Sequence, residues 1–140
     1  MRDGVSPLQM TATCEYLRRG EKQWIQMASL NSPRYLHTMA AISQDVQSSF
    51  IFVLSGENLR ESWSEFKVEW LNVTGTGIPS ANSKWEYGQD TQLSRQLPCA
   101  TTFYDSTTKT QQIWVCGGAN KTHIKGPGLN ECEAINWTMT

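Results

Sequence analysis

The sequence of 140 residues lacks several features that mark common functional classes. It has no excess charge of one sign, with 12 Lys and Arg against 13 Asp and Glu, so no cationic face for nucleic acid is indicated. Its longest unbroken apolar run is residues 50–54, whereas a membrane-spanning helix needs about 20 apolar residues. We therefore expect neither a nucleic-acid partner nor insertion into a membrane.

Helical periodicity and the common cysteine motifs are also missing. Apolar residues do not recur at spacings of three and four for more than a turn or two. The four cysteines form no C-x-x-C pair, which excludes the usual zinc and thioredoxin-like patterns. Six Trp and 27 Ser or Thr are present instead, and these residues suit pleated, half-buried surfaces. The composition therefore favours β-structure.

Two tryptophans and two arginines recur at one spacing. Trp24 and Trp85 stand 61 residues apart, and so do Arg34 and Arg95. Two kinds of block accompany them, an apolar segment that ends in Gly and a segment built around Glu. The first kind occurs at residues 50–56 and 112–118, and the second at 14–17, 68–71 and 132–135. Because the order of the blocks never changes, we infer a tandem repeat of about 60 residues.

Each repeat predicts four short β-strands, which we label a to d. In the middle repeat, strand a covers residues 35–42, strand b 50–54 and strand c 68–71, and strand d begins at Trp85. The b strands are rich in aromatic and β-branched residues and end in small turn residues. We therefore expect an all-β fold made of four-stranded antiparallel sheets repeated along the chain.

This division leaves a polar segment at residues 1–11 and a repeat region at 12–140. Residues 12–27 supply strands c and d of one unit, 34–88 a complete unit, and 95–138 strands a, b and c of the next. The expected total of nine strands corresponds to a little over two four-stranded units.

The order and spacing of these motifs resemble the kelch repeat of β-propellers, over roughly residues 12–138. The similarity is carried by the stretch 24–30, followed by Arg34 and His37, and by the stretch 113–118 with its paired glycines. A propeller closes with about four to eight blades, so about two blades leave the ring open. We expect a partial propeller whose missing blades come from the rest of a longer chain or from other chains.

The repeated residues are expected to have structural roles in such a fold. A Trp on the outer strand fills the wedge between neighbouring blades, and an Arg at the start of strand a donates to carbonyls between blades. A glycine pair after strand b permits positive φ and close backbone approach. These roles are assigned to Trp24, Trp85, Arg34, Arg95, Gly56, Gly117 and Gly118. Ser55 and Ala134 depart from the family pattern, since they replace a glycine and an aromatic residue.

Function is then expected on the loops at one rim. The b–c and d–a loops share a rim, because successive turns of an antiparallel sheet alternate ends. Since kelch proteins commonly bind a partner segment there, the resemblance implies a protein or peptide partner, for example as the substrate-recognition part of a ubiquitin-ligase adaptor. Solvated loop charge is the simpler alternative. The candidate contact residues are Glu57, Arg60, Glu61, Lys121, His123 and Lys125.

Catalysis, a cofactor or a metal is not indicated by the sequence. His37 and His123 have no carboxylate or Cys at ligand spacing. The catalytic alternative, a propeller resembling galactose oxidase, implies two His and two Tyr around copper, and no such cluster is apparent. Cys99, Cys116 and Cys132 fall on three neighbouring strands and could approach one another, but the sequence leaves open whether any thiol is reactive.

Localisation has two interpretations. Residues 1–13 lack an apolar signal-peptide core, which favours the cytoplasm. Three Asn-x-Thr sequons, at Asn72, Asn120 and Asn136, favour a secreted or ectodomain propeller with a role in adhesion or matrix.

Overall fold

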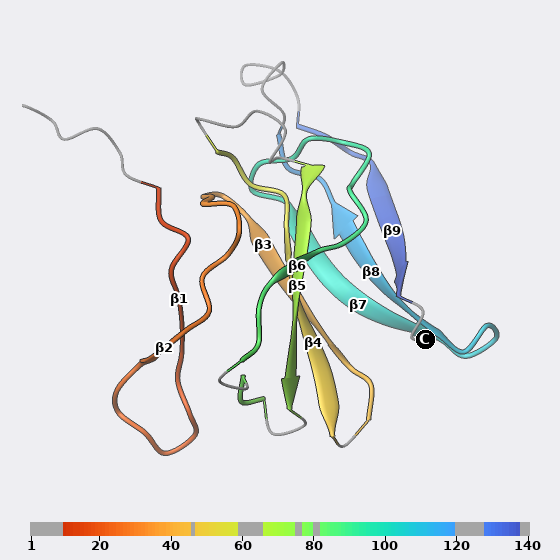
Figure 1. Cartoon of the computed structure of the whole chain (residues 1–140). Helices are drawn as coiled ribbons and strands as arrows, with labels where there is room; N and C mark the ends of the chain where they lie inside the picture. The colour runs from red at the N-terminus through yellow and green to blue at the C-terminus, as the bar shows by residue number, and fades with distance from the viewer. Residues whose placement is uncertain are drawn as a thin grey trace, which may run out of the picture.

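A computed structural model describes residues 10–45, 47–58, 66–74, 77–79, 82–119 and 128–137. In this part of the chain, nine strands form three antiparallel sheets that follow one another in sequence order (Figure 1). The expected all-β class is therefore confirmed.

The three sheets contain two, four and three strands. The first pairs β1 (Cys14–Tyr16) with β2 (Ile25–Met27). The second has the order β3 (Thr38–Ser43), β4 (Ser48–Leu54), β5 (Val68–Thr74) and β6 (Glu86–Tyr87). The third has the order β7 (Cys99–Asp105), β8 (Thr110–Cys116) and β9 (Cys132–Trp137). Within each sheet, consecutive strands pair with one another, which is the antiparallel order expected for strands a to d.

Strand β4 shows how the second sheet builds a core on each of its faces. Successive side chains of a strand point to opposite faces. Phe50, Phe52 and Leu54 therefore pack with residues of the third sheet, whereas Ile51 and Val53 pack toward the first sheet. A strand buried on both faces needs apolar residues at every position, which explains the continuous run at 50–54.

An aromatic cluster dominates the core between the second and third sheets. The ring of Trp137 lies 5.1 Å from that of Phe50, 5.0 Å from Phe52 and 5.3 Å from Trp70, measured between centroids. Tilted and edge-on pairs of this kind stabilise a core beyond the area that they bury. The sequence pattern gave Trp137 no role, because it lies outside the repeated Trp position.

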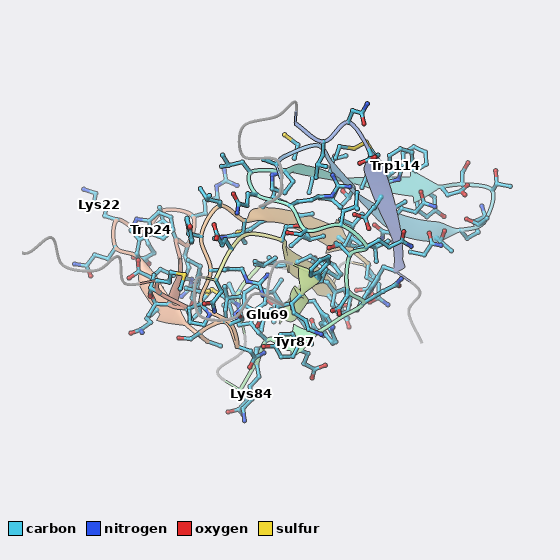
Figure 2. All side chains as sticks on the ribbon, turned by 90° about the horizontal axis from the view of Figure 1, so that it is seen from above. Lys22, Trp24, Glu69, Lys84, Tyr87 and Trp114 are labelled. Atoms are coloured by element: carbon cyan, nitrogen blue, oxygen red, sulfur yellow. A yellow bond between two sulfur atoms is a disulfide. The ribbon has the colours of Figure 1, made fainter. Side chains whose placement is uncertain are left out.

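The repeated tryptophans differ in environment. Trp85 is 4% exposed, packs in the core between the first two sheets and donates its Nε1–H to the Ala28 carbonyl at 2.9 Å. Trp24 is 63% exposed, because it belongs to the sheet at one end of the row (Figures 1 and 2). The expected packing between neighbouring sheets is therefore seen at Trp85 and not at Trp24.

The turn after strand b has a left-handed backbone in both repeats. Ser55 and Gly56 have φ of 62° and 87°, and Gly117 and Gly118 have φ of 68° and 86°. A Cβ on Gly118 would lie 2.5 Å from the Gln96 carbonyl oxygen, so no side chain fits there. Ser55 adopts the conformation that glycine favours, which keeps the turn geometry of the repeat despite the substitution.

Candidate functional site

The b–c and d–a loops lie on one rim, and the structure describes the residues at the base of each loop. Among the candidate contact residues, Glu57 lies in the described part of the chain, at the start of the b–c loop. The other five, Arg60, Glu61, Lys121, His123 and Lys125, lie outside the described residues. The loop bases are held by two clusters of buried polar groups, one in each of the larger sheets.

The first cluster is centred on Arg34, which lies just before β3. Its Nη1 donates to the carbonyls of Ser55, at 3.0 Å, and of Lys67, at 2.7 Å. Its Nη2 donates to Glu69 Oε2 at 2.7 Å, and both side chains are fully buried. Arg34 therefore joins the end of strand b to the start of strand c, which are the two ends of the b–c loop.

Glu69 extends this cluster to the d–a loop. Its carboxylate accepts the backbone N–H of Asn31 at 2.6 Å and that of Ser32 at 3.3 Å. Burial lowers the pKa of Arg34, and the negative charge of Glu69 opposes this shift. The pair is thus a charge-assisted clamp that holds both loops of one rim.

The second cluster repeats this arrangement in the third sheet. Arg95 Nη1 donates to the carbonyls of Gly117, at 2.8 Å, and Glu131, at 3.0 Å. Its Nη2 lies 3.1 Å from Glu133 Oε2, and the same carboxylate accepts the backbone N–H groups of Gln92 and Leu93. The second and third sheets therefore each contain an Arg–Glu pair of the same kind, and each pair holds equivalent loops in place.

These contacts correct the role expected for the two arginines. Each guanidinium does donate to main-chain carbonyls, but through Nη1 it binds carbonyls of its own unit. Arg34 also donates through Nε to the Ser32 carbonyl, in the loop just before that unit. The carboxylate partners were missed, although Glu69 and Glu133 occupy the same position of the repeated Glu block. A Glu and an Arg that recur together at fixed positions of the repeat could have indicated that the two side chains pair.

Glu57 connects the second and third sheets at this rim. It is 8% exposed, and its Oε2 accepts Tyr35 Oη–H at 2.7 Å and Gln96 Nε2–H at 2.8 Å. Main-chain bonds from Gly56 N to the Arg95 carbonyl and from Leu97 N to the Leu36 carbonyl run alongside. Glu57 is thus a framework residue of the described structure, with its carboxylate directed at protein groups.

A pair of leucines with unusual backbone geometry lies next to this connection. Leu36 and Leu97 occupy equivalent repeat positions, and their φ values are 58° and 53°. Leu97 is 68% exposed, so the rim displays an apolar side chain on a left-handed backbone. Left-handed non-glycine residues are costly and concentrate where function requires a fixed geometry. The two leucines stand 61 residues apart, as do the repeated Trp and Arg residues, but the sequence alone assigned them no role.

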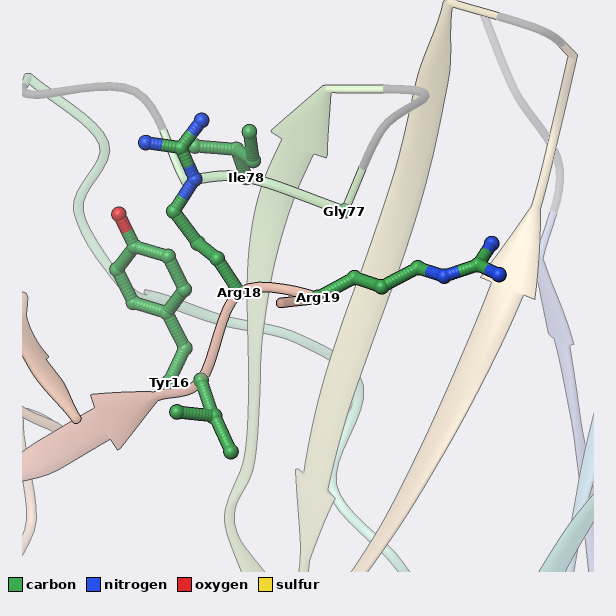
Figure 3. A pocket seen from close by; sticks show the side chains of 6 residues that line it. Tyr16, Arg18, Arg19, Gly77 and Ile78 are labelled. Atoms are coloured by element: carbon green, nitrogen blue, oxygen red, sulfur yellow. The ribbon is translucent and has the colours of Figure 1, made fainter. Parts of the chain in front are cut away.

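The opposite rim contains a shallow pocket of about 240 Å³. It lies between the β1–β2 turn and the segment after β5 (Figure 3). Arg18 extends over it beside Ile78 and above Tyr16, whereas Arg19 points away. The two guanidinium groups diverge, so they do not form one anion site.

Three further observations bear on the possible classes of function. Within the described ranges, no three His, Cys, Asp or Glu side chains are placed to hold a metal ion. No helix in those ranges is long and apolar enough to cross a membrane. In comparisons with known proteins, no protein-family model and no curated protein sequence matches this chain.

Proposed function

We propose that the chain is a non-catalytic protein-interaction module, a partial kelch-type β-propeller that presents its b–c and d–a loops to a peptide or protein partner. The repeated Arg–Glu clamp is the observation that carries this proposal. Buried networks with satisfied hydrogen bonds rigidify their surroundings. Binding residues are typically found on loops that a rigid scaffold positions, and the clamps supply such a scaffold at one rim.

The exposed Leu97 supports the same rim as the contact surface. The Leu97 side chain is 68% exposed and lies beside a buried polar framework. It is therefore an apolar anchor whose backbone loses little conformational entropy when a partner binds. Preorganisation of this kind lowers the entropic cost of association. The variable charges of the neighbouring b–c loops then discriminate between partners.

Selection of binders from a phage-displayed random peptide library tests the proposal with the intact chain. We expect a selected peptide to lose at least about tenfold in affinity for L97D, because an apolar anchor is replaced by a charge. Asp tolerates a left-handed backbone, so the fold is expected to be retained. The matched control is L17D, since Leu17 is 46% exposed near the opposite rim.

A second matched pair of variants tests whether the cationic residues of the candidate loops contribute to binding. The triple variant Arg60→Ala, Lys121→Ala and Lys125→Ala removes three cations from the candidate loops. The triple variant Arg18→Ala, Arg19→Ala and Lys84→Ala removes three cations elsewhere. A peptide that tolerates L97D and the first triple variant but loses affinity with the controls would contradict the proposal.

A secreted or ectodomain propeller is the second candidate, and two observations favour it. Cys116 and Cys132 form a disulfide, and disulfides persist mainly in oxidising compartments. Asn72 and Asn136 are both exposed, as glycosylation requires; Asn120 lies outside the described residues. Expression behind a secretion leader in mammalian cells, with a mass shift on glycosidase treatment that N72Q and N136Q reduce, would support this candidate.

A further inference from the structure

Three cysteines lie level with one another across the third sheet. The strand register places Cys99 on β7 opposite Cys116 on β8, and Cys116 opposite Cys132 on β9. Directly opposite residues of an antiparallel sheet point to the same face, so the three side chains form a row. Cys99 and Cys132 are exposed, and Cys116 is half-buried.

One bond and one free thiol occupy this row. Cys116 and Cys132 form a disulfide with their Cα atoms 4.1 Å apart, and Cys99 is a free, exposed cysteine. Directly opposite residues of antiparallel strands have Cα atoms about 4.5–5.5 Å apart, which is within the range that disulfides span, so both neighbours of Cys116 are within bonding reach. Cys99 and Cys132 are separated by two strand spacings, about 9.5 Å, and that is beyond disulfide geometry.

We infer that Cys116 is the shared partner of two alternative disulfides, one to Cys132 and one to Cys99. The Cys99 thiolate attacks Cys116 Sγ, the Cys116–Cys132 bond breaks as the new S–S bond forms, and Cys132 leaves as a thiolate that takes up a proton. One disulfide and one thiol are present before and after, so the step needs no oxidant or reductant.

The exchange changes which segment is covalently closed. The Cys116–Cys132 bond closes the chain between strands b and c, a sequence separation of 16 residues, whereas a Cys99–Cys116 bond closes the a–b hairpin. Arg95 keeps the strand ends in place in both states, because it binds the carbonyls of Gly117 and Glu131, the residues next to the two cysteines. The switch therefore alters the covalent constraint on one b–c loop without requiring the sheet to separate.

Peptide mapping under non-reducing conditions tests this inference. The three cysteines fall on separate tryptic peptides, 96–109, 110–121 and 126–140, so each linkage has its own mass. The variants are made in a Cys14→Ser background, equilibrated in a glutathione redox buffer and treated with N-ethylmaleimide. We expect C132S to link peptide 96–109 to 110–121, with alkylated Cys99 about tenfold lower than in C116S.

Two controls make either outcome decisive. C116S is expected to leave Cys99 and Cys132 both alkylated, since they are too far apart to pair. The parent protein in the same buffer is expected to show both linkages of Cys116, and C99S only that to Cys132. If C132S is folded by near-ultraviolet circular dichroism and keeps both thiols free, or if the parent never links Cys99 to Cys116, the inference is overturned.

Discussion

Arg34 and Glu69 form an ion pair of 2.7 Å in which neither side chain is exposed to solvent. Burying two charges is costly, and their mutual attraction offsets that cost only where the remaining donors and acceptors are also satisfied. Here the guanidinium also donates to three carbonyls, and the carboxylate also accepts two backbone N–H groups. The pair therefore joins three chain segments, so the loss of one partner affects the whole rim.

We expect E69A to destabilise the protein by about 3–5 kcal/mol, because it leaves the Arg34 charge buried and unpaired. Urea denaturation followed by tryptophan fluorescence measures the change. The control is D90A, which removes an exposed pair between Lys67 and Asp90 with side chains 31% and 46% exposed. That pair is worth about 0–1 kcal/mol. Equal losses in the two variants would contradict the clamp.

Gly118→Ala is expected to cost more than Gly77→Ala. Both glycines have positive φ, of 86° and 77°, so each alanine carries a left-handed backbone penalty of about 1–2 kcal/mol. A Cβ at Gly118 would also lie 2.5 Å from a carbonyl oxygen, whereas a Cβ at Gly77 meets no heavy atom of the described residues within 4 Å. Overpacking adds about 1–3 kcal/mol. Thermal unfolding measures both, and a G118A protein as stable as G77A would show that the turn relaxes.

The strand order was predictable because it follows from local pattern. Turn residues and apolar segments recur at matching offsets, and within each sheet consecutive strands pair with one another, as in residues 50–54 and 68–71. Such pairing needs no long-range information. The same locality explains why the end of strand b was read as a tight turn despite Ser55.

The candidate site was less predictable because its contacts join distant positions. Arg34 and Glu69 are 35 residues apart, and only the folded structure shows that their side chains meet. The disulfide was left open for the same reason, since spacing alone did not show whether any of Cys99, Cys116 and Cys132 are bonded to one another. Trp137 was missed because its packing is set by the neighbouring sheet and not by the repeat.

Trp85→Ala is expected to cost about 3–5 kcal/mol, because it empties a core position and leaves the Ala28 carbonyl without its indole donor. Trp24→Ala provides the matched control. Its side chain is 63% exposed, and surface substitutions usually change stability by no more than about 0.5 kcal/mol. Chemical denaturation of the two variants gives the comparison. A large loss for W24A would show that a further segment covers Trp24.

Asp45, in the turn between β3 and β4, makes the stability of the fold depend on pH in the acid range. Hydrogen bonds from the backbone N–H groups of Gln47 and Ser48, at 2.7 and 2.9 Å, hold the pKa of Asp45 below its ordinary value near 3.9. Because the folded pKa lies below the unfolded one, the contribution is complete above about pH 3.9 and is lost as pH falls through the folded pKa. Asp105 occupies the equivalent turn of the third sheet, and its pKa is lowered in the same direction.

The variant D45N separates this contribution from other acidic groups, since Asn keeps a side-chain acceptor but cannot titrate. We expect the parent to be more stable than D45N at neutral pH, with the difference shrinking as the pH falls through the folded pKa. Thermal unfolding across the acid range gives this difference, and NMR titration of the side-chain carboxyl carbon gives the pKa directly. Titration of Asp45 at or above the ordinary value would contradict the turn geometry, because an acceptor of two backbone N–H bonds must favour its charged form.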